Sequence, residues 1–125
     1  MSATGILQAA TTIAKTTQTA VGAVLPTENY EYLTIFGTYA KGNETGLDII
    51  INFQRTLTGT AYPAVEWTET GGVYTYQAQK YRLTASRNFF IQFYIPAADF
   101  VLITQGGSNN DGTPTGTLAA SYTLA

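Results

Sequence analysis

The stretch Leu47–Arg55, LDIIINFQR, decides the fold class of this chain. Its apolar residues alternate with polar ones, which is the period of a β-strand that turns one face to a core. The apolar face would carry Leu47, Ile49, Ile51 and Phe53, and the opposite face would carry Asp48, Asn52 and Gln54. Ile50 interrupts the polar face, which indicates that this face is partly covered as well.

Further strands are expected on both sides of this stretch, separated by turns such as GNETG at 42–46 and the glycine pair at 71–72. They are Tyr30–Tyr39, Ala64–Glu69, Val73–Leu83, Asn88–Ile95, Phe100–Thr104 and Thr117–Leu124, which with Leu47–Arg55 makes seven. No helical pattern alternates with them, which argues against a parallel α/β sheet. We therefore predict an all-β fold, an antiparallel β-sandwich or jelly-roll-like single domain with an N-terminal arm.

The first 29 residues have a different character. Their apolar positions fit one face of a helix, but their many threonines are poor helix formers because β-branching restricts χ1. Extended or strand structure is favoured, and a helix remains the alternative. We expect residues 1–29 to form an arm or the first strands, and residues 30–125 to form the sandwich domain.

Composition points to a protein that works through its surface. Hydrophobic residues make up 45% of the 125 residues and charged residues only 11%, against about 25% in an average protein. Such a surface suits contact with copies of the same chain or with a scaffold. The six basic residues are scattered and the net charge is −2, so we expect no nucleic-acid binding. Only Lys80, Arg82 and Arg87 are neighbours; they could meet acidic groups of a partner or simply keep a strand soluble.

Several kinds of chemistry are excluded by missing residue types. The chain has no cysteine and no histidine, so disulfides, thiolate catalysis and the commonest general base and metal ligand are absent. No apolar window approaches the length of a membrane span, and the N-terminus lacks the pattern of a signal peptide. We expect no cofactor, no metal and no membrane association. Lysis, or delivery as part of a particle, would take such a chain out of a cell.

The glycine-rich segment from Gly106 to Gly116 admits three interpretations. A P-loop would need lysine where Thr113-Pro114 stands, and a calcium loop would need more acidic ligands than Asp111. A long hairpin tip needs only the glycine, Asn, Asp and Pro residues present. We therefore predict that the flanking strands pair antiparallel and that the tip projects towards a partner.

The carboxylates and aromatic residues give no catalytic constellation. Glu66 and Glu69 should point to opposite faces of a strand, nothing in the sequence brings Asp48 to Glu66, and no base is visible for a Ser or Thr nucleophile. We expect solvated edge charges and no enzyme. The tyrosines of the strands should pack in the core with hydroxyls at the rim, although a binding surface is the alternative. Trp67 is expected to anchor the core.

Four segments resemble small β-sandwich structural proteins of tailed-bacteriophage particles. They are YEYLTIFGT at 30–38, LDIIINFQ at 47–54, AVEWTE at 64–69 and IPAADFVLITQGGSNNDGTPTGTLAASY at 95–122. The insertion at 106–110 departs from the pattern, and the N-terminal segment has no counterpart. The resemblance implies a virion structural protein without catalytic residues, a head decoration (cement) protein or another minor particle component, often trimeric or placed at capsomer junctions.

These expectations define a hypothesis about partners. The chain would bind the major capsid protein and itself, as a homotrimer or other homo-oligomer, on the capsid surface after synthesis in the host cytoplasm. The alternative is a tail, receptor-binding or carbohydrate-binding sandwich. Deletion of residues 1–20 should abolish particle binding and leave the sandwich folded. The expected contact residues are Ile6, Leu7, Ile13, Val21, Val24, Ser108, Asn109, Asn110, Asp111, Thr113, Pro114 and Thr115.

Overall fold

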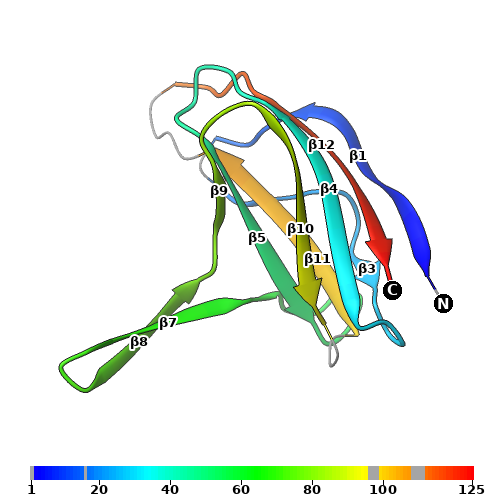
Figure 1. The fold of residues 1–125 in the computed structure, drawn as a ribbon, viewed down its shortest axis with the longest axis vertical. Coiled ribbons are helices and arrows are strands. Elements are labelled where there is room, and N and C mark those ends of the chain that lie inside the picture. The colour runs from blue at the N-terminus through cyan, green and yellow to red at the C-terminus, as the bar shows by residue number, and fades with distance from the viewer. Residues whose placement is uncertain (1, 16, 96–98, 108–111) are drawn as a thin grey trace.

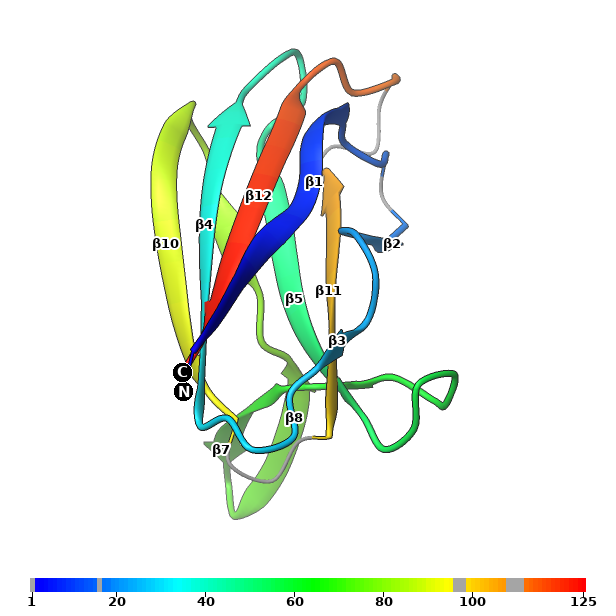
Figure 2. The same ribbon diagram turned by 90° about the vertical axis from the view of Figure 1, so that its right-hand side faces the viewer.

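The computed structural model describes residues 2–15, 17–95, 99–107 and 112–125. Over these residues the chain is all-β, with two facing antiparallel sheets and a separate two-stranded hairpin (Figure 1, Figure 2). The predicted β-sandwich is confirmed. The expected contact residues Ser108, Asn109, Asn110 and Asp111 lie outside the described residues.

The first sheet has four strands in the order β1-β12-β4-β10. Their bounds are β1 Ala3–Thr12, β12 Thr117–Leu124, β4 Tyr32–Ala40 and β10 Arg87–Tyr94. The strands β4 and β12 lie in the middle, and β1 and β10 form the two edges. The second sheet follows the order β2-β11-β5-β6, with β3 also paired to β11 and β9 to β5. Its strands are β2 Thr19–Ala20, β3 Leu25–Pro26, β5 Leu47–Gln54, β6 Tyr62–Pro63, β9 Tyr81–Leu83 and β11 Phe100–Gly107.

The core lies between the two sheets and is aliphatic. Leu47, Ile49 and Ile51 are all at most 1% exposed, as the alternation in β5 predicts. They belong to one cluster with Leu33 and Ile35 of the opposite sheet. The other face of β5 is covered too: Asp48, Ile50, Asn52 and Gln54 are all buried. The indication from Ile50 that this face is not open is therefore confirmed.

The N-terminal residues are strands, so the favoured alternative for this segment is confirmed. The edge strand β1 pairs with β12, and the short strands β2 and β3 pair with β11, so this segment contributes to both sheets. Leu7, Ile13 and Val21 are buried in the core. Deletion of residues 1–20 would remove an edge strand and part of the core, so the structure argues against the expectation that the sandwich stays folded without them.

The prediction that the strands on either side of residues 106–116 pair as a hairpin is also wrong. The strand β11 pairs with β5 in the second sheet, whereas β12 pairs with β4 and β1 in the first. The connection therefore crosses from one sheet to the other. The predicted strand Val73–Leu83 is divided into β8 (Val73–Ala78) and β9, and twelve strands are present in the described residues where seven were expected.

The strands β7 (Val65–Thr70) and β8 form a hairpin that projects from the sandwich (Figure 1). Gly71 and Gly72 connect them with φ angles of 60° and 80°, the positive values of a tight hairpin turn, so this predicted turn is confirmed. Two backbone hydrogen bonds fix the base: Ala64 N–H donates to the Ile51 carbonyl at 2.9 Å and Gln79 N–H to the Ala64 carbonyl at 2.8 Å.

Candidate interaction surfaces

The outer face of the first sheet is almost free of charge. Within its four described strands, Arg87 at the start of β10 is the only charged residue. Strand alternation places every second side chain on this face, and many of those are threonines. A surface of this kind can be covered by a partner without desolvating ions, which is the costly step in burying charged groups.

A row of apolar side chains crosses this face. Register places Ile6, Ser121, Phe36 and Phe90 side by side on the four strands. Ile6 is 81% exposed, Phe36 48% and Phe90 68%. The rings of Phe36 and Phe90 lie 6.3 Å apart. Further along the same two strands, Tyr32 and Tyr94 form a second exposed pair at 5.3 Å. We call these residues the aromatic face: Ile6, Tyr32, Phe36, Phe90 and Tyr94.

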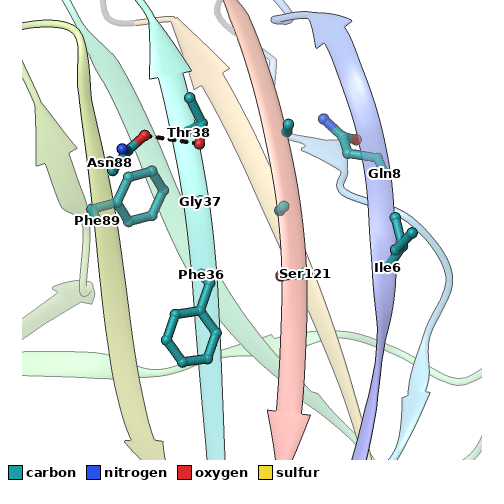
Figure 3. A pocket seen from close by; sticks show the side chains of 10 residues that line it. Ile6, Gln8, Phe36, Gly37, Thr38, Asn88, Phe89 and Ser121 are labelled. Atoms are coloured by element: carbon teal, nitrogen blue, oxygen red, sulfur yellow. Dashed lines mark hydrogen bonds between the residues drawn. The ribbon is translucent and has the colours of Figure 1, made fainter.

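A shallow hollow of about 400 Å³ lies in this face. Figure 3 shows Ile6 and Gln8 of β1 on one side and Phe36 and Phe89 on the other, with Ser121 between them. The small Ser121 side chain leaves the middle of the row low. The face therefore offers an apolar depression with hydrogen-bonding groups at its border, the usual composition of a protein–protein contact.

The β7–β8 hairpin is a second exposed surface, and its two faces differ. One face carries Trp67 opposite Tyr76 and Glu69 opposite Tyr74. Trp67 is 61% exposed and its ring centroid lies 4.7 Å from that of Tyr76. The opposite face is largely polar, because Gln77 donates to Glu66 at 2.8 Å and the hydroxyls of Thr68 and Thr75 are hydrogen-bonded. The expectation that Trp67 anchors the core is wrong.

The tyrosines divide between core and surface. Tyr39 is buried, and Tyr30, Tyr81 and Tyr122 pack against the core. The expectation of core packing is wrong for Tyr32, Tyr74, Tyr76 and Tyr94, which are 42–70% exposed. The alternative of an aromatic binding surface is therefore the better description of these four.

A third surface is a basic groove at one open side of the sandwich. It has a volume of about 570 Å³ and is lined by Lys80–Leu83 and Arg87–Ile91, from β9 and β10 and the residues beside them. Lys80, Arg82 and Arg87 therefore share one groove. Arg82 donates two hydrogen bonds to the Asp48 carboxylate, at 2.7 and 2.9 Å, while its side chain stays 54% exposed.

The segment 112–116 has a structural role where it crosses between the sheets. Gly116 N–H and Gly42 N–H each donate to the carboxylate of Glu44 at 2.9 Å, and the hydroxyl of Tyr39 donates to it as well. Next to it, Asn43 and Thr115 bond to each other through backbone and side chain. The turn at 42–46 therefore holds the crossing segment in place.

Glu44 is fully buried, yet it is held as a carboxylate. Burial alone would raise its pKa, but the hydrogen bonds from Tyr39, Gly42 and Gly116 outweigh burial and lower the pKa to about 2. Burial and the neighbouring carboxylate raise the pKa of the Tyr39 phenol above its usual value. The two groups form a fixed anion–donor pair that stabilises the connection between the sheets.

The other carboxylates considered for catalysis are engaged in structural contacts. Asp48 pairs with Arg82, Glu66 accepts from Gln77, and Glu69 accepts from Gly72 N–H at 2.6 Å in the turn. In the described residues there is no group of three or more metal-ligating acidic side chains. The same residues contain no helix long and apolar enough to cross a membrane.

The expected contact residues are dispersed in the structure. Ile6 lies on the aromatic face, Val24 is half-buried, and Thr113 and Thr115 are exposed at the crossing segment. Leu7, Ile13, Val21 and Pro114 are buried and offer no contact surface. The residues missed are Phe36 and Phe90. The sequence carries a signal for both: Phe36 alternates with the apolar Leu33 and Ile35, and Phe90 lies between Phe89 and Ile91, so each is placed on the face opposite to those residues.

The comparisons with known proteins support the fold. No protein-family model matches the sequence, and no curated protein is significantly similar to it. The chain is similar to a chain in the structure of infectious bursal disease virus, strain Gx, with a TM-score of 0.55 and 13% identity. The likeness covers 99% of this chain and 31% of the viral chain, so the present chain spans about a third of that length. At this identity it is a likeness of β-sandwich fold.

Proposed function

We propose that the chain is a virion structural protein that decorates or cements a bacteriophage capsid, binding major capsid subunits and neighbouring copies of itself. The observation that carries this proposal is the aromatic face, an uncharged sheet surface with Ile6, Phe36 and Phe90 exposed in one row. The likeness of the fold to a chain of a virus particle supports it, as does the resemblance of the sequence to particle proteins of tailed phages.

The mechanism is burial of this face against the shell. Apolar area removed from water contributes about 25 cal/mol per Å² before the costs of association are counted. Few charges have to be desolvated, so most of that contribution is retained. A closed shell presents the same contact many times, and linkage among neighbouring copies then increases the overall affinity. The self-association would give a homotrimer or another homo-oligomer, located on the capsid surface.

A charge placed in the middle of the face tests this function. Phe36→Lys should lower the number of copies bound to decoration-free particles of the encoding phage by about tenfold, since it buries an unpaired cation in the contact. Leu57→Lys is the matched control, because Leu57 is 58% exposed and lies in the loop after β5. Co-sedimentation with quantitative gels measures the copies bound. Equal binding by Phe36→Lys and the wild type would refute the role of this face.

A second function is favoured by the hairpin. Trp67, Tyr74 and Tyr76 are exposed on one face of a projecting element, as in a tail module that binds a receptor or a carbohydrate. In that case a glycan array should give signals that Trp67→Ala removes and Tyr62→Ala retains, because Tyr62 is 55% exposed outside the hairpin. An array without signals for the wild type sets this function aside.

A further inference from the structure

The β7–β8 hairpin is the least supported element of the described chain. An isolated two-stranded hairpin is marginally stable in water. Here all but one of its strand residues are exposed, and among the described residues neither strand pairs with a third. The aromatic stripe of Val65, Trp67, Tyr74 and Tyr76 is consequently open to solvent. A surface of this kind on a rigidly based, projecting element indicates a docking arm.

The basic groove has the complementary character. Its wall is aromatic, with Phe89, Phe90 and Tyr81, and its cations are Lys80, Arg82 and Arg87. These are half of the six basic residues of the chain. Within the described residues, Lys80 and Arg87 have no salt bridge. The hairpin carries Glu66 and Glu69 and no basic residue, so its charge is opposite to that of the groove.

The position of the groove, beside an edge strand, also suits a β-ribbon. It is lined by residues of β9 and β10, and β10 is an edge strand of the first sheet. An edge strand presents backbone N–H and C=O groups that lack a partner on one side. Proteins commonly fill such an edge with an extended segment of another chain, which adds backbone hydrogen bonds to the side-chain contacts.

We propose that the β7–β8 hairpin of one copy docks in the basic groove of a second copy. The aromatic stripe packs on Phe89 and Phe90, and Glu69, which lies on the same face of the hairpin as Trp67, lies near Lys80 and Arg87. The hairpin leaves the sandwich and points away from its own body, so it is presented to a neighbour (Figure 1). This inference specifies the self-association in the proposed function and rests on that part of it alone, because it requires no capsid.

A second copy is the occupant that the charges favour. Both halves of the contact, an acidic aromatic ribbon and a basic aromatic groove, are present on the same chain. If two copies exchange hairpins reciprocally, the contact forms twice around a two-fold axis; if each copy passes its hairpin on, a ring forms. A sugar or a different protein bound to the hairpin would leave the basic groove without a partner, whereas a second copy accounts for both surfaces.

Charge reversal with mixing tests this pairing. The hairpin variant Glu69→Lys and the groove variant Lys80→Glu/Arg87→Glu should each self-associate at least about tenfold more weakly than the wild type, since like charges then face each other. An equimolar mixture of the two should associate again, because every hairpin meets a groove of opposite charge. Sedimentation velocity of the full chain measures all four samples. Rescue on mixing also shows that the variant hairpins are folded.

Two controls test whether the effect depends on the groove itself and on the aromatic face of the hairpin. The first controls for the change in net charge, and the second compares the two faces of the hairpin. Lys15→Glu/Arg55→Glu makes the same charge change at exposed sites outside the groove and should associate like the wild type. Trp67→Ala should dissociate the copies, whereas Thr68→Ala, on the opposite face of the ribbon, should not. A monomeric wild type, or a mixture that stays dissociated, would overturn the proposal. Self-association of a chain that does not bind particles would support the proposal and contradict the capsid function.

Discussion

The outer faces of the two sheets differ in burial: that of the second sheet is covered, and that of the first is exposed. On the second sheet, Asn52 donates to the Leu102 carbonyl at 3.0 Å, and Gln54 donates to three carbonyls of the loop 56–59. The chain thus covers this face with its own segments and satisfies its polar groups. On the first sheet, Phe36 and Phe90 stand exposed. The difference indicates that the second sheet covers its outer face with the chain itself, whereas the first leaves an apolar face exposed, the face that we propose binds a partner.

The largest effect on stability is expected at Glu44, which binds the segment that crosses between the two sheets. Glu44→Ala leaves the amides of Gly42 and Gly116 and the hydroxyl of Tyr39 without their acceptor in a buried site. We expect the free energy of unfolding to fall by about 3–5 kcal/mol. Urea unfolding measures the loss. Glu31→Ala, at an exposed position, should change stability by less than about 0.5 kcal/mol. A loss below about 1 kcal/mol for Glu44→Ala would show that this contact does not hold the sheets together.

The same carboxylate predicts a loss of stability in acid. Its folded-state pKa of about 2 lies below the ordinary value, so its contribution is complete above about pH 4.5 and disappears as the pH falls through 2. The shift corresponds to roughly 3 kcal/mol. We expect the stability difference between the wild type and Glu44→Gln, measured by urea unfolding from pH 6 to pH 2, to stay constant down to about pH 4.5 and then to shrink. A difference that stays constant over this range would mean that folding does not lower the pKa of Glu44.

Much of the fold could be predicted because burial imposes a simple period on strands. The alternation in Leu47–Arg55 identified the core face correctly, and Ile50 indicated the cover on the other side. The turn at Gly71-Gly72 was also predictable, since positive φ values at both positions favour glycine.

The remaining errors concern sheet membership and contacts between distant residues. Glycine and proline residues at 106–116 favour a turn, but they are equally suited to a hairpin and to a crossing between sheets. What decides is the bond from Gly116 to Glu44, which lies 72 residues away. Local alternation likewise cannot show that the β7–β8 hairpin leaves the sandwich, and Trp67 was misplaced for that reason. The basic groove depends on the turn that brings Lys80 and Arg87 together.

The comparison of the two outer faces is tested most directly by one substitution on each face. Asn52→Ala removes a donor to the Leu102 carbonyl and the Thr104 hydroxyl on the covered face, which we expect to cost about 1–3 kcal/mol of stability. Phe90→Ser removes a larger side chain, but that side chain is 68% exposed, so the fold should lose less than about 1 kcal/mol. Self-association should show the opposite: Phe90→Ser should weaken it, and Asn52→Ala should leave it unchanged. Thermal unfolding and sedimentation velocity on both variants give the two orders. If the same variant had the larger effect on both stability and self-association, the two faces would not differ in the way that we infer.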